Sequence, residues 1–286
     1  MPTNPLANVS LWNLLSNLNY SDKLEFFRKN GFAFEIHLTE HCNLNCKGCS
    51  HFSPLAPKEY MDIHSYENDM KRMSELFDEE ILTIRLLGGE PLMHPQVNEF
   101  IKTASFYFPN AYRELITNGI LLLKQPESFW EICRTTNTVI NITRYPVPLN
   151  WSLIKETATN RNVKLDIFPP HNTKTFRKNV YDLTGSQDMC LSHASCNLFG
   201  VCCQLFYGKL YVCSISAYFR HFNNYFKLGI PSADRDSLDI YKIKDKEELY
   251  DFITAPVPCC KYCDIKNQVF DVKWGHSKKN IKEWTL

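Results

Sequence analysis

Between residues 34 and 168, short strand-like stretches alternate with amphipathic helical ones, and this alternation restricts the possible folds more than any other feature of the chain. Residues 34–39 switch between apolar and polar side chains, the period of a half-buried strand. Apolar residues three and four positions apart predict a helix over 63–77. Further strands are predicted at 82–87, 112–116, 139–143 and 163–168, with helices near 97–108, 127–133 and 153–159. Strands separated by helices indicate an α/β fold with a parallel sheet or partial barrel.

The alternation stops after Pro170, and eight of the twelve cysteines lie between Cys190 and Cys263. We therefore expect three regions. The first is a helical segment at 1–30, which carries Leu11, Leu14, Leu15 and Leu18. A barrel at 31–185 and a small cysteine-rich extension at 186–286 follow it. With 44% apolar and 22% charged residues among 286, the chain can bury a substantial core.

The composition argues against several classes of partner. The formal net charge is +1, so a strong positive field for nucleic acid is absent. No apolar run approaches the roughly 20 residues of a membrane span. The first twenty residues lack the continuous apolar stretch of a secretory signal. We expect a cytoplasmic protein that binds neither nucleic acid nor membranes, and in which twelve cysteines indicate metal ligation rather than disulfides.

Three cysteines follow the first predicted strand, at the place where α/β barrels carry their functional loops. Cys42, Cys46 and Cys49 have x3 and x2 spacing. Three thiolates this close can hold three irons of one [4Fe–4S] cluster, which four cysteines normally hold, and leave one iron open. The spacing alone fits two alternatives equally well: a zinc knuckle, or a cluster whose fourth cysteine comes from elsewhere.

The next two strands end in polar turns. Gly88-Gly89-Glu90-Pro91 follows the second strand, where the glycines let backbone N–H groups approach a ligand and Glu90 offers a carboxylate to an ammonium group. Thr117-Asn118-Gly119 follows the third strand, where side chains could hydrogen-bond a ribose. Taken alone, each motif is an ordinary turn signal.

The three motifs together, in this order and at these strand ends, resemble the radical S-adenosylmethionine (SAM) superfamily over roughly residues 32–170. The resemblance implies a partial (β/α)6 TIM-like barrel. It also implies a [4Fe–4S] cluster on Cys42, Cys46 and Cys49, with SAM chelating the open iron through its amino and carboxylate groups.

The resemblance assigns further SAM contacts at the strand ends. They fall on Gly88, Gly89 and Glu90 for the methionyl amine, Asn118 near the ribose, and Thr143 and Arg144 at the end of the fourth strand. One position departs from the family pattern. Members usually have an aromatic residue just before the third cysteine, close to the adenine, and this chain has Gly48 there. His51 and Phe52 are the nearby candidates to replace it.

A second cysteine set lies in the extension: Cys196 and Cys213, with Gly208 between them, and Cys260-x2-Cys263. Gly208 is placed to turn a hairpin between 204–207 and 210–212. The pattern resembles the twitch domain, a shortened SPASM extension of radical SAM proteins, which implies one auxiliary [4Fe–4S] cluster on these four cysteines. A structural zinc site uses the same spacing, and the neighbouring thiols leave the ligand choice open: Cys190, Cys202, Cys203 and Cys259.

The predicted strands carry apolar rows that should face the helices and polar rows that should face the barrel interior. Candidate substrate residues in the polar rows are Glu35, His37, Arg85, Asn141 and Asp166. Buried charges need partners, and a hydroxylated or charged ligand would supply them. The alternative is that these side chains satisfy one another. As a set, they argue against a lipid substrate.

The resemblance implies an enzyme that forms a 5′-deoxyadenosyl radical and removes hydrogen from a small polar substrate. The polar barrel and the extension are similar to those of 2-deoxy-scyllo-inosamine dehydrogenase and the radical SAM carbohydrate epimerases, which predicts oxidation or epimerisation of a sugar, cyclitol or nucleotide-linked sugar. For epimerisation, Cys202 and Cys203 are candidate hydrogen donors. The expected electron donor is a flavodoxin- or ferredoxin-type protein. The alternatives are a SPASM-type peptide-modifying maturase and a zinc-stapled binding module without enzymatic activity.

Overall fold

The structure is a computed structural model that describes residues 18–77, 80–169, 175–196 and 198–286. Its helices are α2 (Tyr20–Asn30), α3 (Ile63–Phe77), α4 (Val97–Tyr107), α5 (Glu127–Thr135), α6 (Trp151–Asn160), α7 (Met189–Ala194), α8 (Ser214–Phe226) and α9 (Lys246–Thr254). Its strands are β1 (Phe32–Thr39), β2 (Ile81–Gly88), β3 (Tyr112–Thr117), β4 (Val139–Thr143), β5 (Leu165–Phe168), β6 (Thr175–Lys178), β7 (Cys203–Phe206), β8 (Lys209–Tyr211), β9 (Ser237–Asp239) and β10 (Val269–Lys273).

One eight-stranded sheet organises the fold, in the order β5-β4-β3-β2-β1-β7-β8-β9. The strands from β5 to β7 in this order are parallel, and β8 and β9 are antiparallel additions. The α/β class and the five predicted strands are therefore confirmed. The sheet stays open within the described residues, and its sixth parallel strand is β7, which lies beside β1. The strand that follows β5 in the chain, β6, pairs instead with β10.

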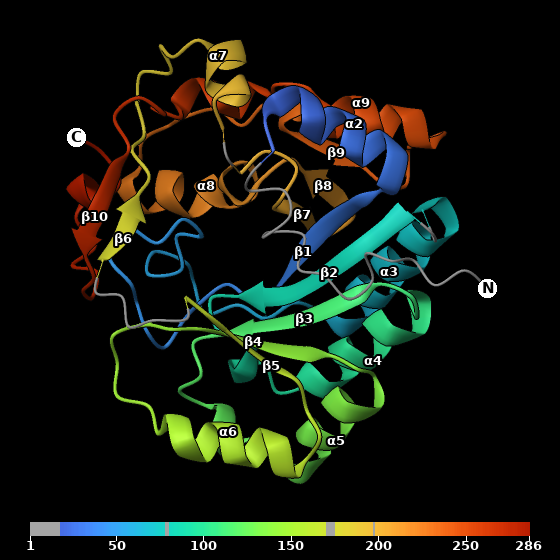
Figure 1. The fold of residues 1–286 in the computed structure, drawn as a ribbon. Coiled ribbons are helices and arrows are strands. Elements are labelled where there is room, and N and C mark those ends of the chain that lie inside the picture. The colour runs from blue at the N-terminus through green and yellow to red at the C-terminus, as the bar shows by residue number, and fades with distance from the viewer. Residues whose placement is uncertain (1–17, 78–79, 170–174, 197) are drawn as a thin grey trace.

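Helices α3, α4 and α5 cover one face of this sheet (Figure 1). The amphipathic spacing predicted for α3 is confirmed, because Tyr66, Met70, Met73 and Phe77 are its buried apolar residues. They pack in the same core as the apolar row of β1, in which Phe34 is fully buried. The carboxyl ends of the parallel strands point toward the β6–β10 pair (Figure 1).

The predicted hairpin at Gly208 is present between β7 and β8. Tyr207 and Gly208 have φ of 44° and 73°, the left-handed pair that a two-residue type I′ turn needs. The backbone N–H of Gly208 donates to Asp69 Oδ2 on α3 at 2.8 Å. Since Leu205 and Leu210 belong to the main core, the extension and the barrel share one hydrophobic interior.

A second core lies under the C-terminal tail, where Trp284 packs with Phe52 and Phe222. At the other end of the chain, Leu18 packs against the main core. The expected helical residues Leu11, Leu14 and Leu15 lie outside the described residues. In the described part of the chain, the helices are all too short or too polar to cross a bilayer.

Candidate functional site at the carboxyl ends of the strands

A cavity of about 430 Å³ opens where β1, β2, β3 and β4 end. Its lining joins the three motifs of the sequence: the Cys42–Cys49 loop after β1, Gly88-Gly89-Glu90 after β2, and Thr117-Asn118 after β3. Parallel strands deliver these loops to one edge of the sheet, which explains why motifs far apart in sequence meet here.

Gly88 and Gly89 have no side chains because the loops after β1 and β2 approach each other too closely to leave room for a Cβ atom. The N–H of Gly89 donates to the Thr39 carbonyl at 2.7 Å. A Cβ atom on Gly89 would collide with the carbonyl of His41 and would lie 2.8 Å from the Cys42 nitrogen. Gly88 has φ of 144°, and a Cβ there would meet the backbone of Thr39. These glycines therefore set the position of the cysteine loop on the sheet.

Glu90 lies fully buried at the cavity wall. Its Oε1 accepts from Thr117 Oγ1 at 2.6 Å and from the Leu92 N–H at 3.1 Å, and its Oε2 accepts from the Asn118 N–H at 2.9 Å. Burial raises the pKa of this carboxyl to about 7, against the lowering effect of these donors. A carboxylate has about four lone-pair sites, so it can accept one more donor from the cavity.

The other predicted SAM contacts divide into two groups. Asn118 and Thr143 line the cavity. The Asn118 Nδ2 donates to Asn43 Oδ1 at 2.8 Å, which ties the β3 loop to the cysteine loop. Arg144 is not among the lining residues that the structure describes, and its guanidinium lies over the Trp151 ring at 4.6 Å.

Cys42, Cys46 and Cys49 are unbridged and all three line the cavity. Burial raises the pKa of Cys42 to about 11 and that of Cys46 to about 12, so as free thiols they would stay protonated at neutral pH. A bound metal deprotonates its thiol ligands outright. N–H donors aim at the sulfurs, with the Leu44 N–H 3.3 Å from Cys42 Sγ and Trp274 Nε1 3.3 Å from Cys46 Sγ. Three thiols with N–H donors around a cavity fit an iron–sulfur cluster.

The aromatic lining of this cavity comes from places that no motif marked. Tyr145 and Phe176 stack with centroids 5.3 Å apart, and Trp274 lies 6.4 Å from Tyr145. Of the two candidates to replace the aromatic residue missing at Gly48, His51 lines the cavity and Phe52 is buried in the second core.

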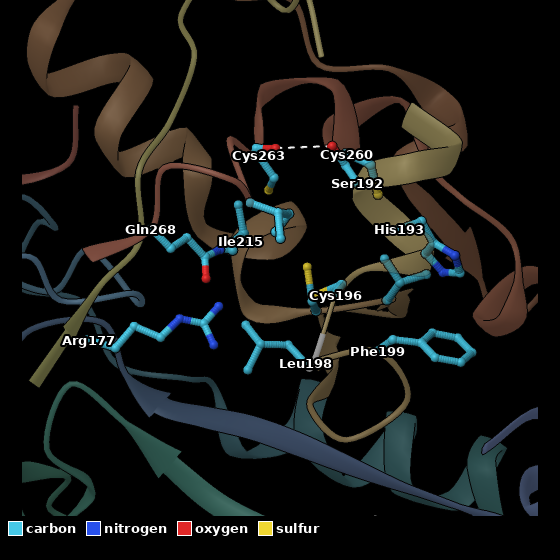
Figure 2. Close-up of a pocket in the computed structure, with 13 residues that line it drawn as sticks. Arg177, Ser192, His193, Cys196, Leu198, Phe199, Ile215, Cys260, Cys263 and Gln268 are labelled. Carbon is cyan, nitrogen blue, oxygen red and sulfur yellow. Dashed lines mark hydrogen bonds between the residues drawn. The ribbon is translucent and has the colours of Figure 1, made fainter. Parts of the chain in front are cut away.

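A second, smaller cavity of about 30 Å³ is lined by Cys196, Cys213, Cys260 and Cys263 (Figure 2). These are the four auxiliary cysteines chosen from the sequence. The neighbouring thiols line neither of the two cavities, as the described residues show: Cys190, Cys202, Cys203 and Cys259. Among the described residues, no three His, Cys, Asp or Glu side chains form a site for a single metal ion. The four thiols line one cavity together, an arrangement in which four cysteines could hold one cluster.

The two cavities share a wall made by Arg177 on β6 and by Leu198. Figure 2 shows the Arg177 guanidinium pointing toward the space that the four cysteines surround. Burial lowers the pKa of Arg177, while the nearby thiols oppose this effect. No sequence motif marks Arg177, because it lies in the short strand β6.

The candidate substrate residues lie away from both cavities. Arg85 donates to Glu114 Oε2 at 2.9 Å and to Glu35 Oε1 at 3.2 Å, and Asn141 donates to Glu114 Oε1 at 3.0 Å. These side chains therefore pair with one another, the alternative that the polar rows left open, although Arg85 Nη2 has no hydrogen-bond partner among the described residues.

The last two candidates have different surroundings. The His37 ring stacks on Tyr218 with centroids 3.6 Å apart, and its Nε2 lies 2.6 Å from His51 Nδ1. Asp166 is half-buried on β5, opposite Asn141 in the strand register. His51, which contacts His37, lines the large cavity.

Comparisons with known proteins agree with this geometry. Residues 31–140 match the family described as "4Fe-4S single cluster domain". The GTP 3',8-cyclases of Campylobacter curvus and Aliarcobacter butzleri are 36% and 35% identical over 89 residues, which cover 30% and 31% of this chain. The chain spans only 27% and 28% of the length of these two relatives.

Among solved structures, BtrN in complex with AdoMet and 2-DOIA is 16% identical with a TM-score of 0.51. The match covers 82% of this chain and 93% of that one, which shows a shared fold. The three motifs gathered at one cavity and the iron–sulfur family match over residues 31–140 agree with the resemblance to the radical SAM superfamily, whose members use a [4Fe–4S] cluster and SAM.

Proposed function

We propose that this chain is a radical SAM enzyme that oxidises a hydroxyl-bearing carbon of a small polar substrate of the carbohydrate type: a sugar, a cyclitol or a nucleotide-linked sugar. The observation that carries the proposal is the wall that Arg177 and Leu198 contribute to both cysteine-lined cavities. A substrate against this wall would lie between two redox groups. Hydrogen abstraction on one side and electron removal on the other together make an oxidation.

The residues that would hold the groups are Cys42, Cys46 and Cys49 for the first cluster and Cys196, Cys213, Cys260 and Cys263 for an auxiliary cluster. When bound, SAM and the two clusters would supply one-electron chemistry: removal of a hydrogen atom from the carbinol carbon and of one electron from the resulting carbon radical, with release of the hydroxyl proton to leave a ketone.

The residues of the chain would bind and orient SAM and the substrate, and they would exclude water from the cavity. The free acceptor site of Glu90 would receive the SAM ammonium group, whose positive charge would favour the ionised carboxylate. Asn118, fixed against Asn43, would meet the ribose. The Arg177 guanidinium would donate hydrogen bonds to substrate oxygens. A cavity of about 430 Å³ is within the size range of small-molecule sites.

The positions of the candidate hydrogen donors favour oxidation over epimerisation. Cys203 is fully buried in β7, within the main core. Cys202 is buried too, and its Sγ lies 3.5 Å from the Leu198 carbonyl. Since neither thiol lines the large cavity, neither is placed to return a hydrogen atom to a substrate there.

Support for the substrate class comes from the cavity and from the shared fold. Hydrogen-bonding side chains of Ser50, Ser53 and Asn179 line the cavity beside Glu90 and Arg177, which suits a hydroxylated ligand. The structure that shares the fold was solved in complex with AdoMet and 2-DOIA. The GTP 3',8-cyclases share too little of their length to transfer their substrate, so GTP serves as a comparison in the test.

The test is anaerobic turnover of the reconstituted enzyme with dithionite and SAM. The panel contains carbon-deuterated sugars, cyclitols and sugar nucleotides, together with GTP and a peptide mixture. We expect deuterium in 5′-deoxyadenosine and a ketone product from one carbohydrate-type compound. Turnover of GTP or peptide alone would refute the substrate class.

Two cysteine variants separate oxidation from epimerisation. Cys213→Ala should keep deuterium transfer into 5′-deoxyadenosine and lose the ketone, because it removes a proposed ligand of the auxiliary cluster. Cys203→Ala should keep both. An epimer that forms in the wild type and disappears only in Cys203→Ala would overturn the proposed oxidation.

A further inference from the structure

The C-terminal strap, residues 274–284, lies across the loop that carries the three cavity cysteines. Backbone bonds join the two segments: the Lys47 N–H donates to the Gly275 carbonyl at 2.8 Å, and the Ser277 N–H donates to the Asn45 carbonyl at 2.7 Å. His276 Nδ1 lies 2.9 Å from the Leu44 carbonyl. These contacts fix the strap against the cysteine loop.

The strap holds its own shape through a buried carboxylate. Glu283 accepts from Ser277 Oγ at 2.6 Å and from the Lys278 N–H at 2.7 Å. The Glu283 side chain belongs to a residue that is only 4% exposed, whereas its two donors lie nearer the surface. These hydrogen bonds restrict the conformation of the strap, which helps to hold Trp274 and Trp284 in place.

The two tryptophans make different contacts with the cysteine loop. The Trp274 indole N–H donates to the sulfur of Cys46 at 3.3 Å. The Trp284 indole N–H donates to the backbone carbonyl of Cys49 at 2.9 Å. One tryptophan reaches a proposed ligand atom, and the other reaches only the backbone beside one.

We propose that Trp274 is a positioning residue that makes the first cluster easier to reduce, by donating its indole N–H to the Cys46 sulfur. This inference rests on the first cluster of the proposed function. Reduction adds one electron to the cluster and takes one from the donor, with no bond formed or broken. Because the reduced cluster is more negative, a hydrogen bond to its thiolate stabilises that state more than the oxidised one.

The surroundings strengthen this effect. Cys46 is half-buried, and hydrogen bonds in sites partly removed from water are stronger than in bulk water. Trp274 also lies beside Tyr145 and lines the cavity in which SAM would bind. The strap thus ties the C-terminal part of the chain to the electron-accepting step of the reaction.

The experiment is redox titration of the reconstituted holoenzyme, followed by electron paramagnetic resonance, without substrate. Trp274→Phe keeps a ring and removes the N–H. We expect a roughly tenfold lower equilibrium constant for reducing the first cluster, which is about 59 mV toward negative potential for a one-electron couple. The auxiliary cluster should keep its potential, as an internal reference.

Trp284→Phe is the matched control, because it removes an indole N–H from the same strap without touching a sulfur. The equilibrium constant for reducing the first cluster of this variant should stay within twofold of the wild-type value. The inference would be overturned if the equilibrium constant for reducing the first cluster of Trp274→Phe lay within twofold of the wild-type value. Equal shifts in the potentials of both variants would also overturn it.

If Trp274→Phe does not take up the first cluster, the same titration is done with benzothienylalanine at position 274. This analogue replaces the indole N–H by sulfur and keeps the shape, so the same two outcomes decide. The failure of the proposed function is distinguishable: it would show as a wild-type spectrum that SAM does not change, while the potentials of the variants remain measurable.

Discussion

Gly89→Ala places a methyl group where the β1 and β2 loops touch. The new Cβ would collide with the His41 carbonyl and lie 2.8 Å from the Cys42 nitrogen, where ordinary contacts begin at 3.4 Å. Both obstacles are backbone atoms next to a proposed cluster ligand, so no side chain can rotate to make room. We expect a loss near the upper end of overpacking costs, about 3 kcal/mol in the free energy of unfolding.

At about 2–4 °C per kcal/mol, this loss lowers the melting temperature of the apo-protein by roughly 6–12 °C. Displacement of the loop should also reduce iron uptake from about eight to about four atoms per chain. Gly275→Ala is the control, since no atom lies within 4 Å of its added Cβ, and its melting temperature should stay within about 2 °C. Full iron loading and an unchanged melting temperature in Gly89→Ala would contradict the close approach described for this turn.

Two further substitutions test the buried carboxylates. Burial raises the Glu90 pKa from 4.5 to about 7, so the folded apo-protein binds more protons than the unfolded chain between these pH values. Protonated Glu90 therefore stabilises the fold by roughly 3 kcal/mol below pH 4.5. This stabilisation is lost as the pH rises to about 7. Urea unfolding should show that loss in the wild type and not in Glu90→Gln, and parallel pH curves would disprove it. Arg85→Ala leaves Glu35 and Glu114 buried without their cation and should cost about 3–5 kcal/mol. Arg161→Ala breaks a more exposed ion pair and should cost at most about 1 kcal/mol in the same denaturant titration, and similar losses in both arginine variants would refute the buried network.

Local patterns in the sequence were enough to predict the barrel strands and the cysteine loop. Residues 34–39 of β1 alternate, and the spacing of Cys42, Cys46 and Cys49 gained its meaning from the two motifs that follow the next strands. The choice of Cys260 over Cys259 rested on x2 spacing to Cys263, and it is Cys260 that lines the second cavity.

Other features depend on contacts that no local pattern contains. Trp274 is more than 220 residues from Cys46 in the chain, and only the folded tail brings them together. The polar row on β1 and β2 had two interpretations, because ligand binding and mutual pairing use the same residue types. In the structure, Arg85 pairs with Glu35 and Glu114, which no local pattern could show.

The pairing of β7 with β1 has a consequence for how the protein is made. Strand β1 emerges early in synthesis, yet its neighbour at 203–206 is added some 160 residues later. Until then, one side of β1 presents free N–H and C=O groups of the kind that recruit foreign strands. A fragment that stops before β7 would carry this exposed edge permanently, so the barrel half is expected to aggregate when expressed alone.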